Sequence, residues 1–170
     1  MIKHILDTTE QIIEGSLAYQ QFSKDLKQDN NYSQAEKHQI RTLVNALLNR
    51  YFRYFYSLTE GEETTLSRHD VLALSLFSFN REKKVMDLTY EDFLASLPSE
   101  TQVKFEEAYP DTFFPIKIPK HFHSENPALS LAARFSVPLP LVEQLISDIG
   151  RKNLLKFFTN RYRETYGLIN

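Results

Sequence analysis

The chain has 170 residues, of which 42% are apolar and 25% charged, and its formal net charge at pH 7 is −2. This balance is typical of a globular domain and argues against a globally basic nucleic-acid-binding protein. Cysteine is absent, which excludes disulfides, thiolate metal sites and cysteine nucleophiles. The sequence shows no apolar run near the ~18 residues of a membrane span, and its first residues lack the apolar core of a signal peptide. We therefore expect a cytoplasmic protein.

The charge is unevenly distributed along the chain. Residues 1–60 are neutral, whereas residues 61–125 carry 7 basic and 12 acidic side chains, a net charge of −5. Residues 126–170 carry 6 basic and 3 acidic side chains, a net charge of +3. A basic end of this kind has two interpretations, a solvated helical face or a surface for an anionic partner.

The first half of the sequence predicts three helices. Residues 2–28 have the period of two helices joined at Gly15, with Ser16 as a candidate cap of the second. Residues 33–58 form the longest helical pattern, which opens with the capping-box pair Ser33 and Glu36. Apolar residues then recur at three- and four-residue spacing, which predicts a long central helix against which the others pack.

Residues 59–125 predict an acidic loop, three helices and an extended segment. Ser67 with Asp70 resembles a capping box, and the apolar residues that follow predict a deeply buried helix. Shorter helices are expected from Thr89 and from Ser99, since Pro98 and a later proline end them. Residues 109–124, rich in proline and aromatic residues, are expected to cross over the core in an extended form, with a brief strand at 116–118.

The C-terminal region predicts three further helices and a tail. Asn126 followed by proline predicts an N-cap for a helix that ends near Phe135, and Gly150 predicts the C-cap of the next one. Within that second helix the residues expected to face inward are Leu141, Val142, Leu145, Ile146 and Ile149. A last helix is expected from Arg151 to about Asn160, followed by a β-like tail at 165–170. The predicted fold class is all-α.

Few groups of residues in the sequence suggest a catalytic or metal-binding site. His121 and His123 have a spacing that can chelate a metal on a strand, but no third ligand follows nearby, so a surface loop is the preferred interpretation. His69 beside Asp70 suggests an oriented imidazole, yet Asp70 is better explained as the capping partner of Ser67. The four glycines are widely separated, so phosphate-cradling loops are absent, and no serine has a nucleophile-elbow context.

Three stretches in order resemble the N-terminal region of bacterial rRNA cytosine-C5 methyltransferases of the Sun (Fmu/RsmB) type. Residues 7–19 are similar to the opening helix and glycine turn of that family. Residues 33–50 resemble its capped helix. Residues 128–170 resemble the passage that leads from the helical domain to the first catalytic strand. Residues 85–125 match no part of the family pattern.

The resemblance implies a NusB-like, RNA-binding helical bundle at residues 1–125 and a helical linker at 126–170 that leads toward an absent methyltransferase domain. The chain would then be the front part of a larger enzyme. The parent enzyme would use S-adenosylmethionine, whereas this chain is expected to hold no cofactor. Attack on cytosine needs a cysteine nucleophile, and the methyl donor needs a glycine-rich turn. Because this chain has neither, we expect that it does not catalyse the reaction by itself.

Two functional hypotheses follow. In the first, the chain positions structured RNA, in particular rRNA, through phosphate contacts. The candidate contact residues are Arg134, Arg151, Lys152, Lys156, Arg161 and Arg163, followed by Arg50 and Arg53. In the second, the chain is a NusB-like protein–protein adaptor or antitermination factor, and residues 85–125 dock a catalytic domain or a transcription factor. Neither hypothesis involves a membrane or a metal ion.

Overall fold

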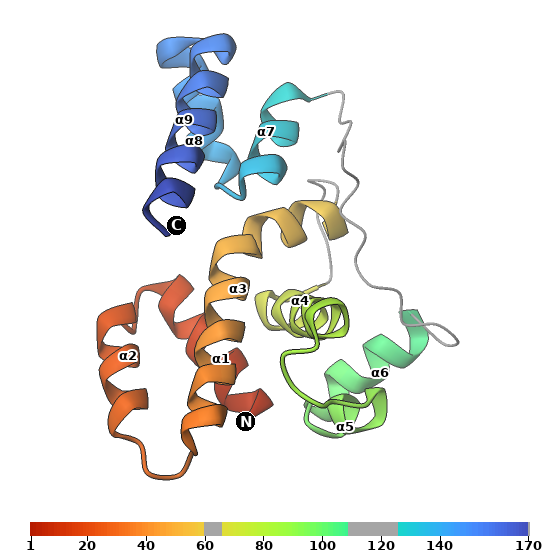
Figure 1. The fold of residues 1–170 in the computed structure, drawn as a ribbon. Coiled ribbons are helices and arrows are strands. Elements are labelled where there is room, and N and C mark those ends of the chain that lie inside the picture. Colours follow the sequence, from red (N-terminus) through yellow and green to blue (C-terminus); the bar gives the residue numbers. More distant parts are fainter. Residues whose placement is uncertain (60–65, 109–125, 170) are drawn as a thin grey trace. The chain divides into compact units, whose positions relative to one another are not determined.

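The structure is a computed structural model that describes residues 1–59, 66–108 and 126–169, without the side chains of residues 104–108 and 161–169. These residues form helices and no strand, which confirms the predicted all-α class (Figure 1). The helices are α1 (Ile2–Glu14), α2 (Tyr19–Gln28), α3 (Gln34–Thr59), α4 (Arg68–Lys83), α5 (Tyr90–Ala95), α6 (Ser99–Ala108), α7 (Pro127–Phe135), α8 (Leu139–Ile149) and α9 (Arg151–Ile169).

Several predicted features lie outside the described residues. They are the acidic loop at 60–65, the extended crossing at 109–124, the brief strand at 116–118, and the pair His121 and His123.

The chain divides into two compact units, and the boundary between them falls inside α3. The first unit comprises Met1–Tyr51 and Thr64–Lys117, and the second comprises Phe52–Glu63 and Ile118–Asn170. The second unit therefore contains the last two turns of α3 in addition to the predicted C-terminal region.

Local capping chemistry sets where the helices of the first unit begin and end. In the capping box of α3, the Ser33 N–H donates to Glu36 Oε2 over 2.7 Å and the Glu36 N–H donates to Ser33 Oγ over 3.2 Å. Ser67 and Asp70 form the same reciprocal pair at the start of α4. Both predicted capping boxes are confirmed.

The predicted cap of α2 is wrong, because Ser16 serves the helix before it. Gly15 ends α1 in the left-handed conformation, with φ at 81°. Ser16 then donates from both its backbone N–H and its Oγ to the Gln11 carbonyl, at 3.0 and 3.2 Å. The Gln11 carbonyl in the last turn of α1 is thereby satisfied, whereas α2 begins after Ala18 without a side-chain cap.

The core of the first unit is built around α4, whose residues from Val71 to Asn80 are all buried. Helix α1 packs on α4, and two side-chain contacts join these helices: an ion pair between Arg68 and Glu14 at 3.3 Å, and a contact of 3.2 Å between His69 Nδ1 and Glu10 Oε2. Helix α3 contributes a buried stripe at the predicted spacing, Ile40, Leu43, Val44, Leu47 and Tyr51. The predicted deep burial of α4 is therefore confirmed.

The core of the second unit joins the end of α3 to α7, α8 and α9. The described residues that form its buried apolar cluster are Tyr56, Ala128, Leu129, Leu131, Ala132, Ala133, Phe135, Val142, Leu154 and Phe158. Asn126 caps α7 by accepting from the Ala128 N–H over 3.0 Å, as its sequence context predicts. Tyr56 Oη accepts a hydrogen bond from the Leu139 N–H over 2.6 Å, at the first residue of α8.

The predicted inward stripe of α8 is only partly right. Val142 is fully buried, and Leu145 and Ile146 are half-buried. Leu141 and Ile149, however, are 47% and 41% exposed. Leu141 lies about 100° around the helix from Val142, and Ile149 is the last residue of α8, so neither reaches the core.

The expected β-like tail is also wrong, because α9 continues to Ile169. Once a helix is nucleated, each added residue gains a backbone hydrogen bond at little further entropic cost. This propagation outweighs the weak strand preference of the tyrosine and isoleucine residues near the C-terminus.

No single described helix has both the length and the apolar composition needed to cross a membrane. By these two criteria alone, α7 and α8 qualify as a joined pair, but the break between them bends the pair by 117°.

Candidate nucleic-acid interface

Three of the predicted cations lie exposed in the first two turns of α9. Arg151 and Lys152 occupy the first turn, and Lys156 follows one turn later. The Gly150 carbonyl accepts from the Leu154 N–H over 3.0 Å, so Gly150 immediately precedes the helix. Glycine has no side chain with which to cap the N–H groups of this first turn. The start of α9 therefore presents cationic side chains beside backbone donors that Gly150 has no side chain to cap.

These cations are not explained by the stability of the helix. The N-terminal turn of a helix carries a positive partial charge, so Arg151 and Lys152 oppose the dipole, where acidic residues would favour it. The first turn of α9 contains no acidic residue. None of the three cations forms an ion pair with any residue whose side chain is described. An external anion would neutralise this charge.

Arg53 holds the end of α7 in place, whereas the Arg134 side chain is exposed. The Arg53 side chain donates from Nη2 to the Arg134 carbonyl over 2.8 Å, and the Arg53 backbone N–H donates to Ser136 Oγ over 3.2 Å. Arg134 itself is exposed, with its guanidinium 5.2 Å from the centre of the Phe135 ring. Arg134 thus remains accessible to a ligand, whereas one Nη2 donor of Arg53 is already used by the fold.

The remaining predicted cations fall elsewhere. Arg50 belongs to the first unit, where its half-buried guanidinium lies 4.7 Å from the centre of the Phe79 ring. Such a cation–π contact stabilises the packing of α3 on α4. Arg161 and Arg163 belong to α9, but their side chains lie outside the described part of the structure.

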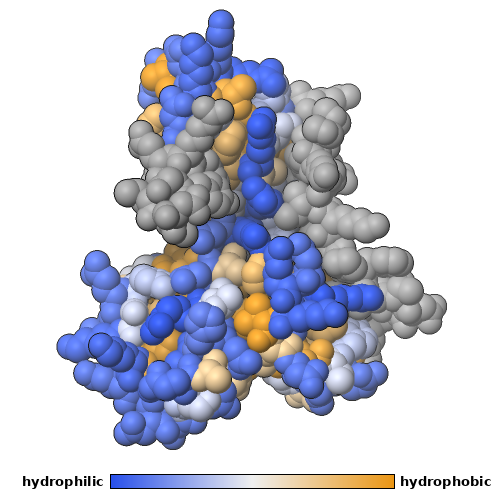
Figure 2. Space-filling model, in the orientation of Figure 1, coloured by the Kyte–Doolittle hydropathy of each residue, from blue (hydrophilic) through white to orange (hydrophobic). Residues whose placement is uncertain are grey.

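The second unit also exposes large apolar side chains. Figure 2 shows hydrophobic residues at the surface among the hydrophilic ones around α8 and α9. Among the side chains of these two helices that the structure describes, the exposed large apolar ones are Leu141, Ile149, Leu155 and Phe157. The sequence pattern predicts that two of them, Leu141 and Ile149, face inward. Adjacent helical residues lie about 100° apart, so the pair Phe157 and Phe158 already indicated that one ring faces the core more fully than the other.

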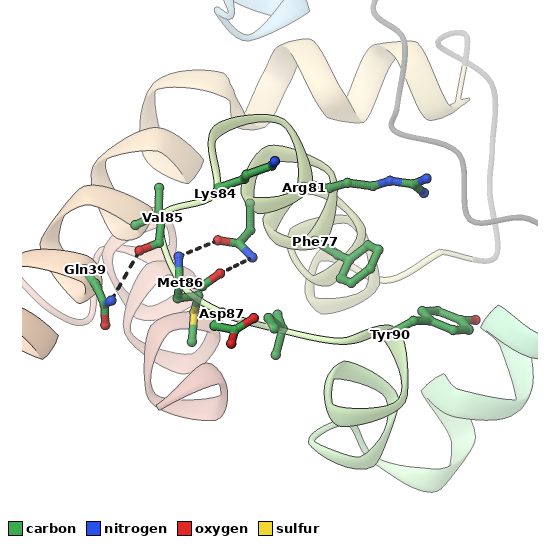
Figure 3. Close-up of a pocket in the computed structure, with 10 residues that line it drawn as sticks. Gln39, Phe77, Arg81, Lys84, Val85, Met86, Asp87 and Tyr90 are labelled. Carbon is green, nitrogen blue, oxygen red and sulfur yellow. Dashed lines mark hydrogen bonds between the residues drawn. The ribbon is translucent and has the colours of Figure 1, made fainter.

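A separate cavity of about 690 Å³ lies in the first unit, between α4 and the segment that leads to α5 (Figure 3). Asn80 fixes one wall, because its side chain donates to the Met86 carbonyl over 3.0 Å and accepts from the Met86 N–H over 2.9 Å. Gln39 donates to the Val85 carbonyl over 3.2 Å. The described lining residues are Gln39, Phe77, Asn80, Arg81, Lys84, Val85, Met86, Asp87, Leu88 and Tyr90.

The described residues that line this cavity include one carboxylate, Asp87, and no serine or histidine, so they hold no serine–histidine pair of nucleophile and base. The described residues also contain no group of three or more potential metal ligands. Asp70, which the sequence places beside His69, accepts from the Ser67 N–H over 2.9 Å, as its capping role predicts. These observations leave the surface of the second unit as the stronger candidate site.

Comparison with known proteins identifies no matching family model, curated protein or solved structure for this chain.

Proposed function

We propose that this chain binds structured RNA through the phosphate backbone and positions it for an attached or partner methyltransferase. The resemblance to the Sun-type enzymes suggests rRNA as the ligand and a NusB-like arrangement as the finer fold. The observation that carries the proposal is the cluster of exposed cations at the start of α9, Arg151, Lys152 and Lys156. Their charge opposes the helix dipole and has no described partner, so a bound phosphate would relieve an unfavourable local field.

Charge reversal at Lys152 and Lys156 tests this proposal. The probe is an rRNA stem-loop, and binding to the full chain is followed by fluorescence anisotropy across a range of salt concentrations. We expect the K152E/K156E variant to bind at least about tenfold more weakly at low salt. Each phosphate contact contributes about 0.7–0.9 to the slope of log affinity against log salt, so the slope should fall by about 1.4–1.8.

The chain offers a matched control on α2, where Lys24 and Lys27 are also exposed. The K24E/K27E variant changes the net charge by the same amount at a different surface. It should keep most of the affinity and the original salt slope. An equal loss in both variants would mean that only overall charge matters, and an unchanged affinity in K152E/K156E would remove the α9 surface from the proposal.

The second candidate is a protein–protein adaptor, which the exposed apolar residues favour. Val103 on α6 is 51% exposed and lies within residues 85–125, the segment expected to dock a partner. On α8, Leu141 and Ile149 are 47% and 41% exposed. Association with a protein partner that persists at high salt and is lost in V103D or L141D would favour the adaptor over RNA binding, since apolar contacts are not screened by ions.

A further inference from the structure

Phe157 is half-exposed although the residue beside it belongs to the core. Phe158 is 3% exposed and stacks on Phe135 with the ring centres 4.9 Å apart, whereas Phe157 is 50% exposed. The centres of the Phe157 and Phe158 rings are 5.8 Å apart, and the ring planes are inclined by 57°. The three rings thus form a row from the core of the second unit to its surface. This contact supports the exposed ring from behind and leaves one side of it accessible.

Among the described side chains of α9, the exposed neighbours of Phe157 are polar or cationic. Asn153 and Asn160 lie on the same side of the helix, four residues before and three after it, and Lys156 lies about 100° around; all three are exposed. The exposed Leu155 lies about 200° around the helix, on a different side. Protein-binding hot spots are usually ringed by further close-packed contacts that exclude water. A single aromatic ring among amides and an ammonium group is instead typical of a platform that stacks on a nucleobase.

We infer that Phe157 stacks on an unpaired base of the RNA whose phosphates contact Lys152 and Lys156. This inference rests on the proposed function and narrows it to a class of ligand. In a continuous A-form duplex, neighbouring bases cover the faces of each base, so only a loop, bulge or end can offer a free face to the ring. The preferred ligand is therefore a stem-loop or a bulged helix rather than an uninterrupted duplex.

The experiment compares two RNA probes on the full chain. One is a hairpin with 2-aminopurine in its loop, and the other is an uninterrupted duplex of the same length and base composition. The variant F157L keeps an apolar side chain and removes the ring, and F157Y keeps the ring. Because Phe157 is half-exposed, both variants should keep the circular dichroism spectrum and the urea midpoint of the parent chain.

We expect F157L to bind the hairpin about 5- to 150-fold more weakly, the range for the loss of one stacked base. Its affinity for the duplex should stay unchanged, and the fluorescence quenching of 2-aminopurine on binding should disappear. F157Y should bind the hairpin within about twofold of the parent chain. The salt slope should be the same in all three proteins, since no phosphate contact is removed.

Three results would overturn the inference. Full hairpin affinity in F157L would mean that the contact is ordinary apolar burial, as a protein partner would make. An equal loss on hairpin and duplex would mean that the ring does not distinguish unpaired bases. If the parent chain bound neither probe in a salt-dependent manner, the proposed RNA-binding function would fail as well. If the parent chain bound both probes but F157L gave either of the first two results, only the stacking inference would fail.

Discussion

The hydrogen bond from Leu139 to Tyr56 makes a quantitative prediction about the second unit. Tyr56 is 6% exposed, and its Oη accepts from the Leu139 N–H over 2.6 Å, across 83 residues of sequence. That N–H lies in the first turn of α8, where it has no acceptor within the helix, and the N-cap residue, Pro138, makes no side-chain cap bond. Replacing Tyr56 with phenylalanine keeps the ring but leaves the donor without this acceptor. An unsatisfied buried donor costs about 1–3 kcal/mol, and since this site is partly buried we expect about 1–2 kcal/mol.

A double-mutant cycle separates this bond from other effects of the substitution. Leu139→Pro removes the same N–H at the first helical position, where proline is well tolerated. Pro138 has φ of −59° and ψ of 135°, a conformation that a following proline permits. Lost packing of the Leu139 side chain cancels in the cycle, so Tyr56→Phe should cost about 1–2 kcal/mol less in the L139P background than in the parent chain.

Urea unfolding followed by circular dichroism measures the four stabilities of the cycle. Tyr19→Phe serves as a control, because Tyr19 is 36% exposed and its ring contact with Phe22 survives the change. A coupling energy below about 0.5 kcal/mol would lie within the scatter of independent sites. That result would refute the conclusion that the end of α3 is fastened to the start of α8.

The remaining predictions concern single sites, each measured by urea unfolding. Asn80→Ala removes both hydrogen bonds to Met86 and should lower the free energy of unfolding by about 2–4 kcal/mol; a loss under 1 kcal/mol would contradict the role of Asn80 in fixing that segment. Leu154→Ala, at a fully buried site, should lower it by about 2–5 kcal/mol, whereas Leu155→Ala, at an exposed site, should lower it by less than 1 kcal/mol; equal losses would contradict the assigned faces of α9. Ser67→Ala removes the cap of α4 and should cost about 1 kcal/mol, and no loss would contradict the capping box.

The features that sequence reasoning predicted well are those set by residues close together in the chain. The capping boxes of Ser33 with Glu36 and of Ser67 with Asp70, and the cap at Asn126, depend on side chains within a few residues of the backbone groups that they satisfy. The prediction for Ser16 is wrong because a serine between two helices can bond either to the end of the preceding helix or to the start of the following one. The left-handed conformation of Gly15 decides between these two bonds.

The features that could not be predicted depend on tertiary partners. Helical spacing gave α8 a wide apolar stripe, but only the positions that face the neighbouring helices are covered, so Leu141 and Ile149 remain exposed. The bonds from Arg53 to Arg134 and from Leu139 to Tyr56 join residues more than 80 positions apart, which no local pattern predicts. The charge of the sequence indicates a basic C-terminal end, but only the tertiary structure distinguishes the exposed cations of α9 from Arg53, whose side chain is bonded to the Arg134 carbonyl.

The placement of α3 in both units has a consequence for synthesis of the chain on the ribosome. Phe52, Phe55 and Tyr56 are made early, but the residues that cover them in α7, α8 and α9 begin at position 127. Tyr56 and its hydrogen-bond donor are 83 residues apart, so at about 5–20 residues per second the interval is roughly 4–17 s. For that time the end of α3 carries uncovered aromatic side chains. A nascent chain stalled within this interval should therefore bind chaperones. That binding should end once α7, α8 and α9 have emerged from the ribosome.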